Sequence, residues 1–381
     1  MRIGLDARWI FPELSGIGTY TAELIRELAR SDAGHDFILF FNNPAIRDRV
    51  WQSAGLHEHP RFCAQMVPWG VFSPWSQLRL PAVLKRLSLD VFHSPNYMIP
   101  FRAFPRGRPH AAKCIVTIHD LIPLLFPEHT PKALKTRLFP LFKRLMSEVG
   151  ARADAILTVS ETSRADIIRS LRIPAGQDLR VRVVYNGVAP EYQSVPRPAA
   201  AKKTILYVGR FDPYKNVEGL LEVFARVRSR GGPDVRLRII GAPDPRYPEA
   251  PRKARELGLE GAVEWSGYAG GMDLVAAYQQ ADVFALLSRY EGFGLTVLEA
   301  MACGTPVVCS RIGALREVAG DAALLVDPDD PEAAADALWR VLNDSGVATD
   351  LSRKGPERAR QFTWARTAAD TVKIYEEVAR R

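Results

Sequence analysis

The chain has 381 residues, of which 47% are hydrophobic and 25% charged, a composition typical of a globular protein with more than one core. At about 150 residues per domain, this length predicts two domains. No run approaches the about 20 consecutive apolar residues of a membrane helix, and Met1 leads directly into Arg2–Asp6 without the apolar core of a signal peptide, so we expect a soluble cytosolic protein. The four cysteines form no Cys-x-x-Cys pair, which argues against a zinc site or a disulfide framework.

The positive charge lies in the N-terminal half of the chain. Residues 1–190 contain 25 Lys and Arg against 16 Asp and Glu, a net charge of +9, whereas residues 191–381 contain 26 against 27, a net charge of −1. This asymmetry indicates that the first half meets an anionic partner, which leaves nucleic acid, a phosphorylated acceptor and a membrane surface open.

Short β-branched runs alternate with helical stretches such as Thr19–Arg30, which predicts a parallel α/β sheet covered by helices on both faces. The strands expected in the first half are Arg2–Asp6, Phe37–Phe41, Asp90–His93, Cys114–His119, Ala155–Val159 and Val181–Tyr185.

A second series of strands and helices begins after a proline-rich segment without a periodic apolar face. We therefore predict an N-terminal domain over residues 1–190, a linker over 191–203 and a second domain over 204–362. In two such domains a ligand is expected at the carboxyl ends of the strands. The strands expected in the second domain are Thr204–Val208, Leu237–Ile240, Ala262–Trp265, Val283–Leu287, Pro306–Cys309 and Ala322–Val326.

The segment Ser15–Tyr20 follows the first predicted strand and contains Gly16 and Gly18. Backbone amides at the start of the helix Thr19–Arg30 can face a phosphate or a sugar there, although a plain turn stays open. The full dinucleotide fingerprint is absent, because Thr21 stands where a third glycine is required, and this argues against an NAD-dependent oxidoreductase.

Two cations follow the first strand of the second domain, Arg210 after Gly209 and then Lys215. Because they are presented at a strand's carboxyl end, they suit a diphosphate: Arg offers a planar fork and Lys a point charge. The alternative is a loop with two solvated cations.

The segment 288–306 carries the most information. Gly292 and Gly294 free the backbone where the strand Val283–Leu287 gives way to a helix, so amides near them can point at phosphate. Glu291 and Glu299 are eight positions apart, which is about 12 Å along a helix and exceeds the roughly 5 to 9.5 Å of a glycoside hydrolase pair. The spacing favours two hydroxyl-binding acids, with an incidental ion pair as the alternative.

Together these segments resemble family 4 of the retaining glycosyltransferases. This resemblance covers nearly the whole chain and implies the GT-B fold, an α/β fold with two Rossmann-like domains facing across a cleft and a C-terminal helix (363–381) that returns to the N-terminal domain. The segments that carry it are Glu291-x7-Glu299 with Gly292-Phe293-Gly294, the run Glu299–Pro306, Gly209-Arg210 with Lys215, Gly16-Ile17-Gly18 and Phe362-Thr363-Trp364.

The resemblance implies roles for the matching side chains. Arg210 and Lys215 would hold the diphosphate, Glu291 the hydroxyls of the donor sugar, and Glu299 the ribose. His119, at a strand end, resembles the family histidine that lies beside the donor sugar and the attacking hydroxyl, and it would orient the sugar or stabilise positive charge through its carbonyl. We do not expect it to be the general base.

The other implied donor contacts come from backbone and loops. They are Gly209, Phe293, Gly294 and Leu295 around the phosphates, Gly16 and Gly18 closing over them from the first domain, and Gly267 and Tyr268 near the nucleobase.

The resemblance thus implies a hexosyltransferase that moves a sugar from a nucleotide-diphosphate donor to a glycan or lipid-linked acceptor, with retention and without a metal or other cofactor. The segment His119–Glu128 most resembles bacterial mannosyl- or rhamnosyltransferases of surface polysaccharide or glycolipid synthesis, and of their donors we favour GDP-mannose. UDP- and dTDP-sugars stay open, as does a sugar-nucleotide epimerase of the same fold. A nucleic-acid-binding protein would explain the positive charge but not the paired glutamates, so we expect no nucleic-acid partner.

Two segments bear on the acceptor. The uncharged segment Phe62–Leu78 contains Trp69, Phe72 and Trp75, and the segment Pro131–Met146 is basic and amphipathic. Together they are typical of a peripheral protein on an anionic bilayer, at the inner face of the cytoplasmic membrane. A core-facing loop and a helix with a solvated basic face are the alternatives.

Overall fold

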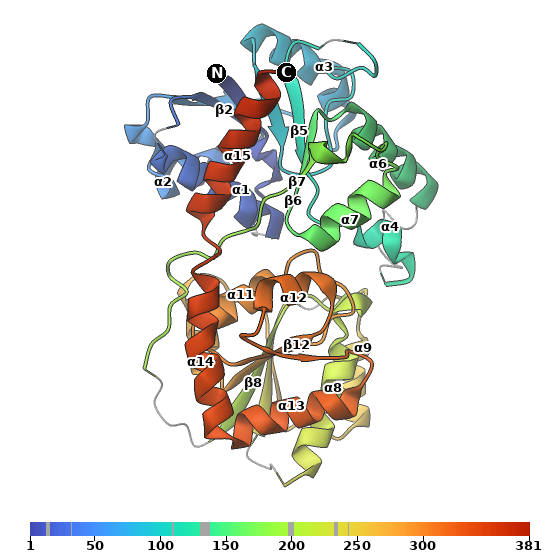
Figure 1. The fold of residues 1–381 in the computed structure, drawn as a ribbon, viewed down its shortest axis with the longest axis vertical. Coiled ribbons are helices and arrows are strands. Elements are labelled where there is room, and N and C mark those ends of the chain that lie inside the picture. The colour runs from blue at the N-terminus through green and yellow to red at the C-terminus, as the bar shows by residue number, and fades with distance from the viewer. Residues whose placement is uncertain are drawn as a thin grey trace. The chain divides into compact units, whose positions relative to one another are not determined.

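The computed structural model describes residues 1–12, 16–31, 33–108, 110–129, 138–196, 202–231, 235–242 and 244–381. They form two compact units, each built on one parallel sheet (Figure 1). The first unit contains Met1–Leu124, Leu138–Gly187 and Trp364–Arg381. The second contains Val188–Thr363 and a short segment that begins at Leu125.

The described strands of the first unit are β1 (Arg2–Leu5), β2 (Asp36–Phe41), β3 (Phe62–Met66), β4 (Val91–Ser94), β5 (Lys113–Thr117), β6 (Ala155–Thr158) and β7 (Val181–Val183). They form a sheet in the order β3-β2-β1-β4-β5-β6-β7, in which Ile3 lies opposite both Phe37 and Val91. The central strands β4 and β6 are buried along their whole length, as expected of strands covered on both faces.

The α-helices described in this unit are α1 (Gly16–Arg30), α2 (Pro44–Ser53), α3 (Pro74–Leu87), α4 (Ile122–Leu125, whose last residue belongs to the second unit), α6 (Phe139–Arg152), α7 (Glu161–Ser170) and α15 (Trp364–Ala379). Local side chains define where several of them begin: Asn43 accepts from the first amides of α2, and Ser160 from the amide of Ser163 in α7. No helix in the described part of the chain is both long and apolar enough to span a membrane.

The second sheet has the order β10-β9-β8-β11-β12-β13, and its pairings are again parallel. Its described strands are β8 (Lys203–Val208), β9 (Val235–Ile240), β10 (Val263–Ser266), β11 (Val283–Leu286), β12 (Val307–Ser310) and β13 (Leu324–Val326). Its described α-helices are α8 (Val217–Ser229), α9 (Glu249–Glu256), α10 (Met272–Gln280), α11 (Leu295–Ala302), α12 (Gly313–Ala319), α13 (Pro331–Asn343) and α14 (Ser345–Ala359).

The two parallel sheets confirm the predicted α/β fold class, but some local predictions need correction. Strand β3 was not predicted, because it pairs only with β2 at the edge of the sheet and only Phe62 of its residues is buried, so it has no buried apolar run. Lys203, predicted as the last linker residue, is the first residue of β8. Residues 197–201 of the predicted linker lie outside the described residues.

The C-terminal helix α15 belongs to the first unit and packs on α1 and β5, which confirms the predicted return of this helix (Figure 1). A buried polar contact helps to fix it: Tyr375 Oη lies 2.6 Å from Nδ1 of His93, and Nε2 of His93 lies 2.8 Å from Oγ1 of Thr117. Burial lowers the pKa of His93 to about 3, so its imidazole is neutral at pH 7 and both ring nitrogens are used.

We expect Tyr375→Phe to lower the free energy of unfolding by about 1 to 3 kcal/mol, because it leaves a buried nitrogen of His93 without its partner. Urea unfolding followed by circular dichroism measures this loss. The control is Tyr268→Phe, since the Tyr268 side chain is 62% exposed and its variant should unfold as the wild type does. Equal stability of the two variants would contradict a stabilising role for the His93 contact.

Candidate functional site

Helix α11 begins at the carboxyl edge of the second sheet without a side-chain cap. It starts after Gly294, which has a φ of 103° and makes no capping bond. Helices α8, α9, α10 and α12 also begin without a side-chain cap, whereas α13 and α14 are capped by Asp330 and Asp344. A side chain at position 294 would be strained and would collide with Leu315. The uncapped amides and positive dipole end of α11 favour an anion at this edge.

A buried ion pair joins two loops at the same edge. Nζ of Lys215, at the end of a short 3-10 helix after β8, donates to both carboxylate oxygens of Glu291, at 2.7 and 3.0 Å. The side chains are only 15% and 10% exposed. Burial opposes the charged form of Lys215, but Glu291, Tyr207 and Asp212 together outweigh this effect and raise the lysine pKa, so the ammonium group is charged at neutral pH.

Backbone contacts reinforce this junction. The left-handed Asn216 follows Lys215 and donates its side-chain amide to the carbonyl of Leu287, at the end of β11, at 3.0 Å. The amide of Arg289 donates to the carbonyl of Tyr214 at 2.7 Å. The loops after β8 and β11 therefore have a fixed relative position.

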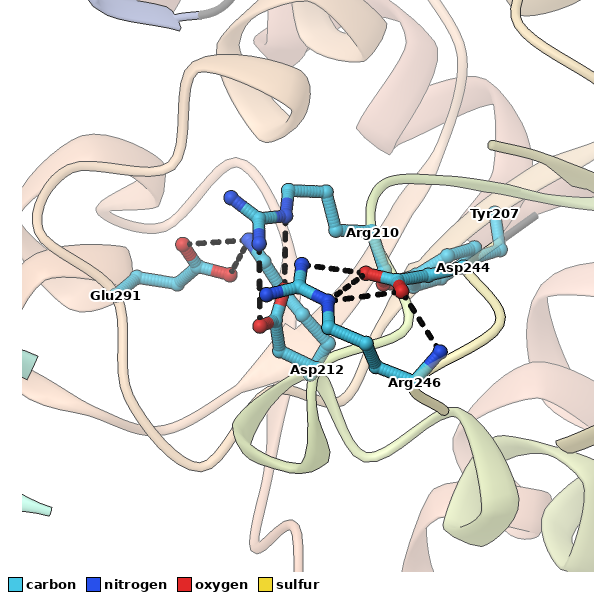
Figure 2. Close-up of polar contacts among 7 residues, drawn as sticks. Tyr207, Arg210, Asp212, Asp244, Arg246 and Glu291 are labelled. Atoms are coloured by element: carbon cyan, nitrogen blue, oxygen red, sulfur yellow. Dashed lines mark hydrogen bonds and ion pairs between the residues drawn. The ribbon is translucent and has the colours of Figure 1, made fainter. Parts of the chain in front are cut away.

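Arg210 lies beside this pair (Figure 2). Its side chain is 66% exposed, and its Nε lies 2.8 Å from a carboxylate oxygen of Asp212, which is almost fully buried. In the loop after β9, Arg246 binds both oxygens of Asp244, and hydrogen bonds from Arg246 together with the charge of Arg210 lower the pKa of Asp244. The site thus presents an exposed guanidinium oriented by a buried carboxylate.

Glycines allow the loops after β8 and β9 to meet. The amide of Gly209 donates to the carbonyl of Ile240 at 3.0 Å, and a side chain at Gly241 would collide with the carbonyl of Gly209. This close approach brings Arg210 next to the loop that carries Arg246.

Glu299 lies on α11 and is 8% exposed. Tyr278 of α10 donates to its Oε2 at 2.8 Å, and Tyr192 also hydrogen-bonds to the carboxyl group. Burial raises the pKa of Glu299 to about 7, and the two tyrosine hydroxyls only partly offset this effect. Glu299 is therefore close to half-protonated at neutral pH.

The predicted helical spacing between Glu291 and Glu299 needs correction. Glu291 lies in the loop that precedes α11, and the helix begins only at Leu295, so the distance of about 12 Å along a continuous helix does not apply. Their partners differ, since Glu291 binds an ammonium and Glu299 binds tyrosine hydroxyls. Phe293 is buried and its ring contacts Phe362, so this position contributes packing as well as an amide.

The predicted nucleobase segment follows β10, and Gly267 and Tyr268 lie in the loop beyond it. Tyr268 is exposed, and a side chain at Gly267 would meet nothing within 4 Å, so the loop is open. Phe211, next to Arg210, lies with its ring centroid 6.0 Å from that of Trp265 at the end of β10. Aromatic faces therefore lie between the cationic loop and this segment.

His119 lies in the first unit, just beyond β5, which ends at Thr117 rather than at His119 as predicted. Its Nε2 is 3.0 Å from the carbonyl of Pro95, and a carbonyl only accepts, so Nε2 carries the proton. Burial lowers the pKa of His119, and its own carbonyl accepts a hydrogen bond from Ser163 at 3.1 Å. Tyr20 packs edge-on against the imidazole, at 4.9 Å between ring centroids. The imidazole is thus neutral because of its lowered pKa, and it is held in place by Pro95 and Tyr20.

The glycines of the first unit are placed differently from the prediction. Gly16 and Gly18 form the first turn of α1, which begins at Gly16 and not at Thr19. Ser15 lies outside the described residues. The amides of Gly16 and Gly18 thus belong to the first turn of the helix itself rather than to residues just before it.

Sequence reasoning missed Asp212, Asp244, Arg246, Tyr192 and Tyr278. The first three come from two loops, and no spacing along the chain shows that those loops meet. An acid two positions after Arg210 was the available signal for Asp212. Among the described residues, no three His, Cys, Asp or Glu side chains are grouped as a metal site requires.

Two family models match the chain, and together they cover most of it. "Glycosyltransferase Family 4" matches residues 14–192, and "Glycosyl transferases group 1" matches residues 189–358. An O-antigen chain mannosyltransferase B of Escherichia coli is 30% identical over 95% of this chain and 96% of its own length. This chain belongs to glycosyltransferase family 4.

Other similar proteins agree with this assignment. A D-inositol 3-phosphate glycosyltransferase of Saccharomonospora viridis is 36% identical over 96% of this chain and 90% of its own length. A sucrose-phosphate synthase from Thermosynechococcus elongatus has the same fold, with a TM-score of 0.76, 22% identity and coverage of 99% of this chain and 98% of that chain. The protein is thus a GT-B hexosyltransferase that takes a sugar from a nucleotide-sugar donor.

The raised pKa of Glu299 makes the stability of this glycosyltransferase depend on pH. The unfolded carboxyl titrates near 4.5 and the folded one near 7, so the contribution of Glu299 is fully present below 4.5 and is lost as the pH rises through 7. Relative to Glu299→Gln, we expect the wild type to lose about 2 to 3 kcal/mol of unfolding free energy between pH 4.5 and 8.

Urea unfolding at several pH values tests this difference, and the comparison between variants cancels the titration of other groups such as His93. The exposed Glu260→Gln is the matched control and should follow the wild type at every pH. A constant difference between the wild type and Glu299→Gln would show that Glu299 titrates normally.

Proposed function

We propose that this glycosyltransferase transfers mannose from GDP-mannose to a glycan or lipid-linked acceptor of surface polysaccharide or glycolipid synthesis, with retention at the anomeric carbon. The observation that carries the donor assignment is the arrangement at the carboxyl edge of the second sheet. There the exposed Arg210, the Lys215–Glu291 pair and the uncapped start of α11 come from loops that contact one another.

The two cations and the helix start suit a diphosphate. Arg210 can form a forked pair with phosphate oxygens, and Lys215 retains an N–H donor after its two bonds to Glu291. Amides of Phe293, Gly294 and Leu295 lie at the positive end of α11, beside Gly209 and its loop in the proposed donor site. Gly16 and Gly18, at the start of α1, add a second helix N-terminus to the proposed set of phosphate contacts.

The carboxylates suit hydroxyl groups rather than acid-base chemistry. Glu291 is held by Lys215 and is assigned to the hydroxyls of the donor sugar, and Glu299, among two tyrosine hydroxyls, is assigned to the ribose. The open loop of Gly267 and Tyr268 is assigned to the nucleobase.

The reaction breaks the bond between the anomeric carbon and a phosphate oxygen and forms a bond from that carbon to the acceptor oxygen. The acceptor's proton passes to the departing diphosphate, whose growing charge Arg210 and Lys215 stabilise. His119 is assigned to the position beside the donor sugar. Its Nε2–H donates to the carbonyl of Pro95 and its pKa is lowered, so Nε2 has no free lone pair to accept a proton. We therefore assign His119 to orienting the sugar and not to general-base catalysis.

The mannose assignment is supported by the Escherichia coli mannosyltransferase relative and by the resemblance of the segment His119–Glu128 to bacterial mannosyltransferases.

We expect calorimetry in EDTA to show tight binding of GDP. UDP, dTDP and ADP should bind at least roughly tenfold more weakly than GDP, and NAD should not bind. GDP-mannose should then support transfer. Preference for UDP or dTDP would replace the donor, conversion of the sugar nucleotide without acceptor would indicate an epimerase, and binding of no nucleotide would contradict the site itself.

We expect Arg210→Gln to lower kcat by roughly 30- to 1,000-fold, because a preorganised charge on the leaving group is lost, with little effect on the fold since the side chain is 66% exposed. The matched control is Arg353→Gln on α14, outside these loops, which removes a guanidinium that is 56% exposed and paired with Asp350 and should retain kcat within about threefold. Equal losses in both variants would assign the effect to general charge and not to Arg210.

A further inference from the structure

The excess positive charge of the chain is concentrated in one segment of the first unit. Residues 59–119 contain eight Lys and Arg but a single acid, Asp90. This segment includes α3 and the loops on either side of β4. None of the residues assigned to the donor lies in it apart from His119, so donor binding does not explain this charge.

Helix α3 exposes apolar and basic side chains on the same face. Trp75 is 52% exposed and Leu78 47%, and Arg79 lies 5.1 Å from the centre of the Trp75 ring. The helix carries three cations, the others being Lys85 and Arg86, and it has no acidic residue. A large exposed tryptophan among cations is unusual for a face that meets only water.

Helix α6 also exposes apolar and basic side chains, with Leu141 and Arg144 three positions apart on one side of the helix. Leu141 is 63% exposed and Leu138, just before the helix, 49%, and the exposed Lys143 and Arg144 follow them. The predicted amphipathic segment began at Pro131, but residues 131–137 lie outside the described residues.

Aromatic contacts connect the two helices. Phe72, 58% exposed just before α3, packs on Trp9 with ring centroids 5.4 Å apart, and Trp9 packs on Tyr97 at 6.0 Å. Tyr97 in turn contacts Phe142 of α6 at 5.5 Å. These four rings form an aromatic base that runs without a break from Phe72 to helix α6.

We propose that this face docks on an anionic lipid bilayer. The docking surface consists of Phe72, Trp75, Arg79, Leu141, Lys143 and Arg144. Aromatic and leucine side chains enter the boundary between headgroups and acyl chains, while Lys and Arg reach the lipid phosphates, which is the composition expected of a peripheral protein. A second copy of the chain fits this surface less well, because it would bring cations against cations.

The position of the surface agrees with an acceptor that resides in the membrane. Trp9 follows β1 and Tyr97 follows β4, so the aromatic base lies at the carboxyl edge of the first sheet, where His119 follows β5. Docking there would present this edge to lipid. The proposal itself does not depend on the donor assignment, because it rests on charge and exposure alone.

The test is sedimentation of the full chain with vesicles made either of phosphatidylcholine or of an equal mixture of phosphatidylcholine and phosphatidylglycerol. We expect binding to the mixed vesicles only, weakened by salt. Lys143→Gln with Arg144→Gln should weaken it roughly 30-fold, and Phe72→Ser with Trp75→Ser more than roughly tenfold. Brominated lipid should quench the fluorescence of the wild type more than that of Trp75→Phe.

Matched controls locate the effect. Arg366→Gln with Lys373→Gln removes two exposed cations of α15, and Leu179→Ser removes a leucine that is 69% exposed elsewhere in the same unit; both should bind as the wild type does. Thermal unfolding verifies that the variants fold. The proposal would be overturned if the control variants lost as much binding, or if the chain bound equally well to vesicles with and without phosphatidylglycerol. Self-association of the wild type that the Phe72 and Trp75 substitutions abolish would instead identify a second copy of the chain as the partner.

Discussion

The ion pair between Lys215 and Glu291 holds together the loops that follow two adjacent strands, β8 and β11, and these loops carry Arg210 and lead into the start of α11. A buried Lys215 or Glu291 without its partner would lower the stability of the fold by several kcal/mol, so the ion pair favours one relative position of the two loops. Asn216 and the amide of Arg289 extend the same junction with hydrogen bonds to backbone carbonyls. Helix α11 then begins a few residues beyond Glu291, and its uncapped amides face the same edge.

The first unit is built differently at its carboxyl edge, where a buried polar network lies beneath an exposed surface of apolar and basic side chains. His93, Thr117 and Tyr375 satisfy one another inside the core, and this arrangement ties α15 to the strand that precedes His119. His119 is in turn fixed by the Pro95 carbonyl and the ring of Tyr20. Because these contacts are internal, the outer faces of α3 and α6 are not needed for them, and their cations and aromatic side chains are available for a partner.

Much of the fold and part of the candidate site follow from local patterns. Parallel strands buried on both faces have continuous apolar runs, and the glycines before α11 mark a helix start, so the sheets, Arg210, Lys215, Glu291 and Glu299 are all detectable in the sequence. The edge strand β3 lacks such a run and was missed. The neighbours Asp244 and Tyr278 were also missed, since they reach the site from other strands and helices at positions that no spacing reveals.

The sequence by itself determined the alternation of strands and helices, the family and the types of charged group at the donor edge, because periodicity, glycine placement and a dense motif are local properties of the chain. Only the tertiary structure decided how those groups are paired. Whether Glu291 meets Lys215 or water, and whether Glu299 titrates near 4.5 or near 7, depends on which side chains arrive from distant segments and how far they exclude solvent. Burial and pairing are properties of the packed chain, so they arise only when the strands are assembled side by side.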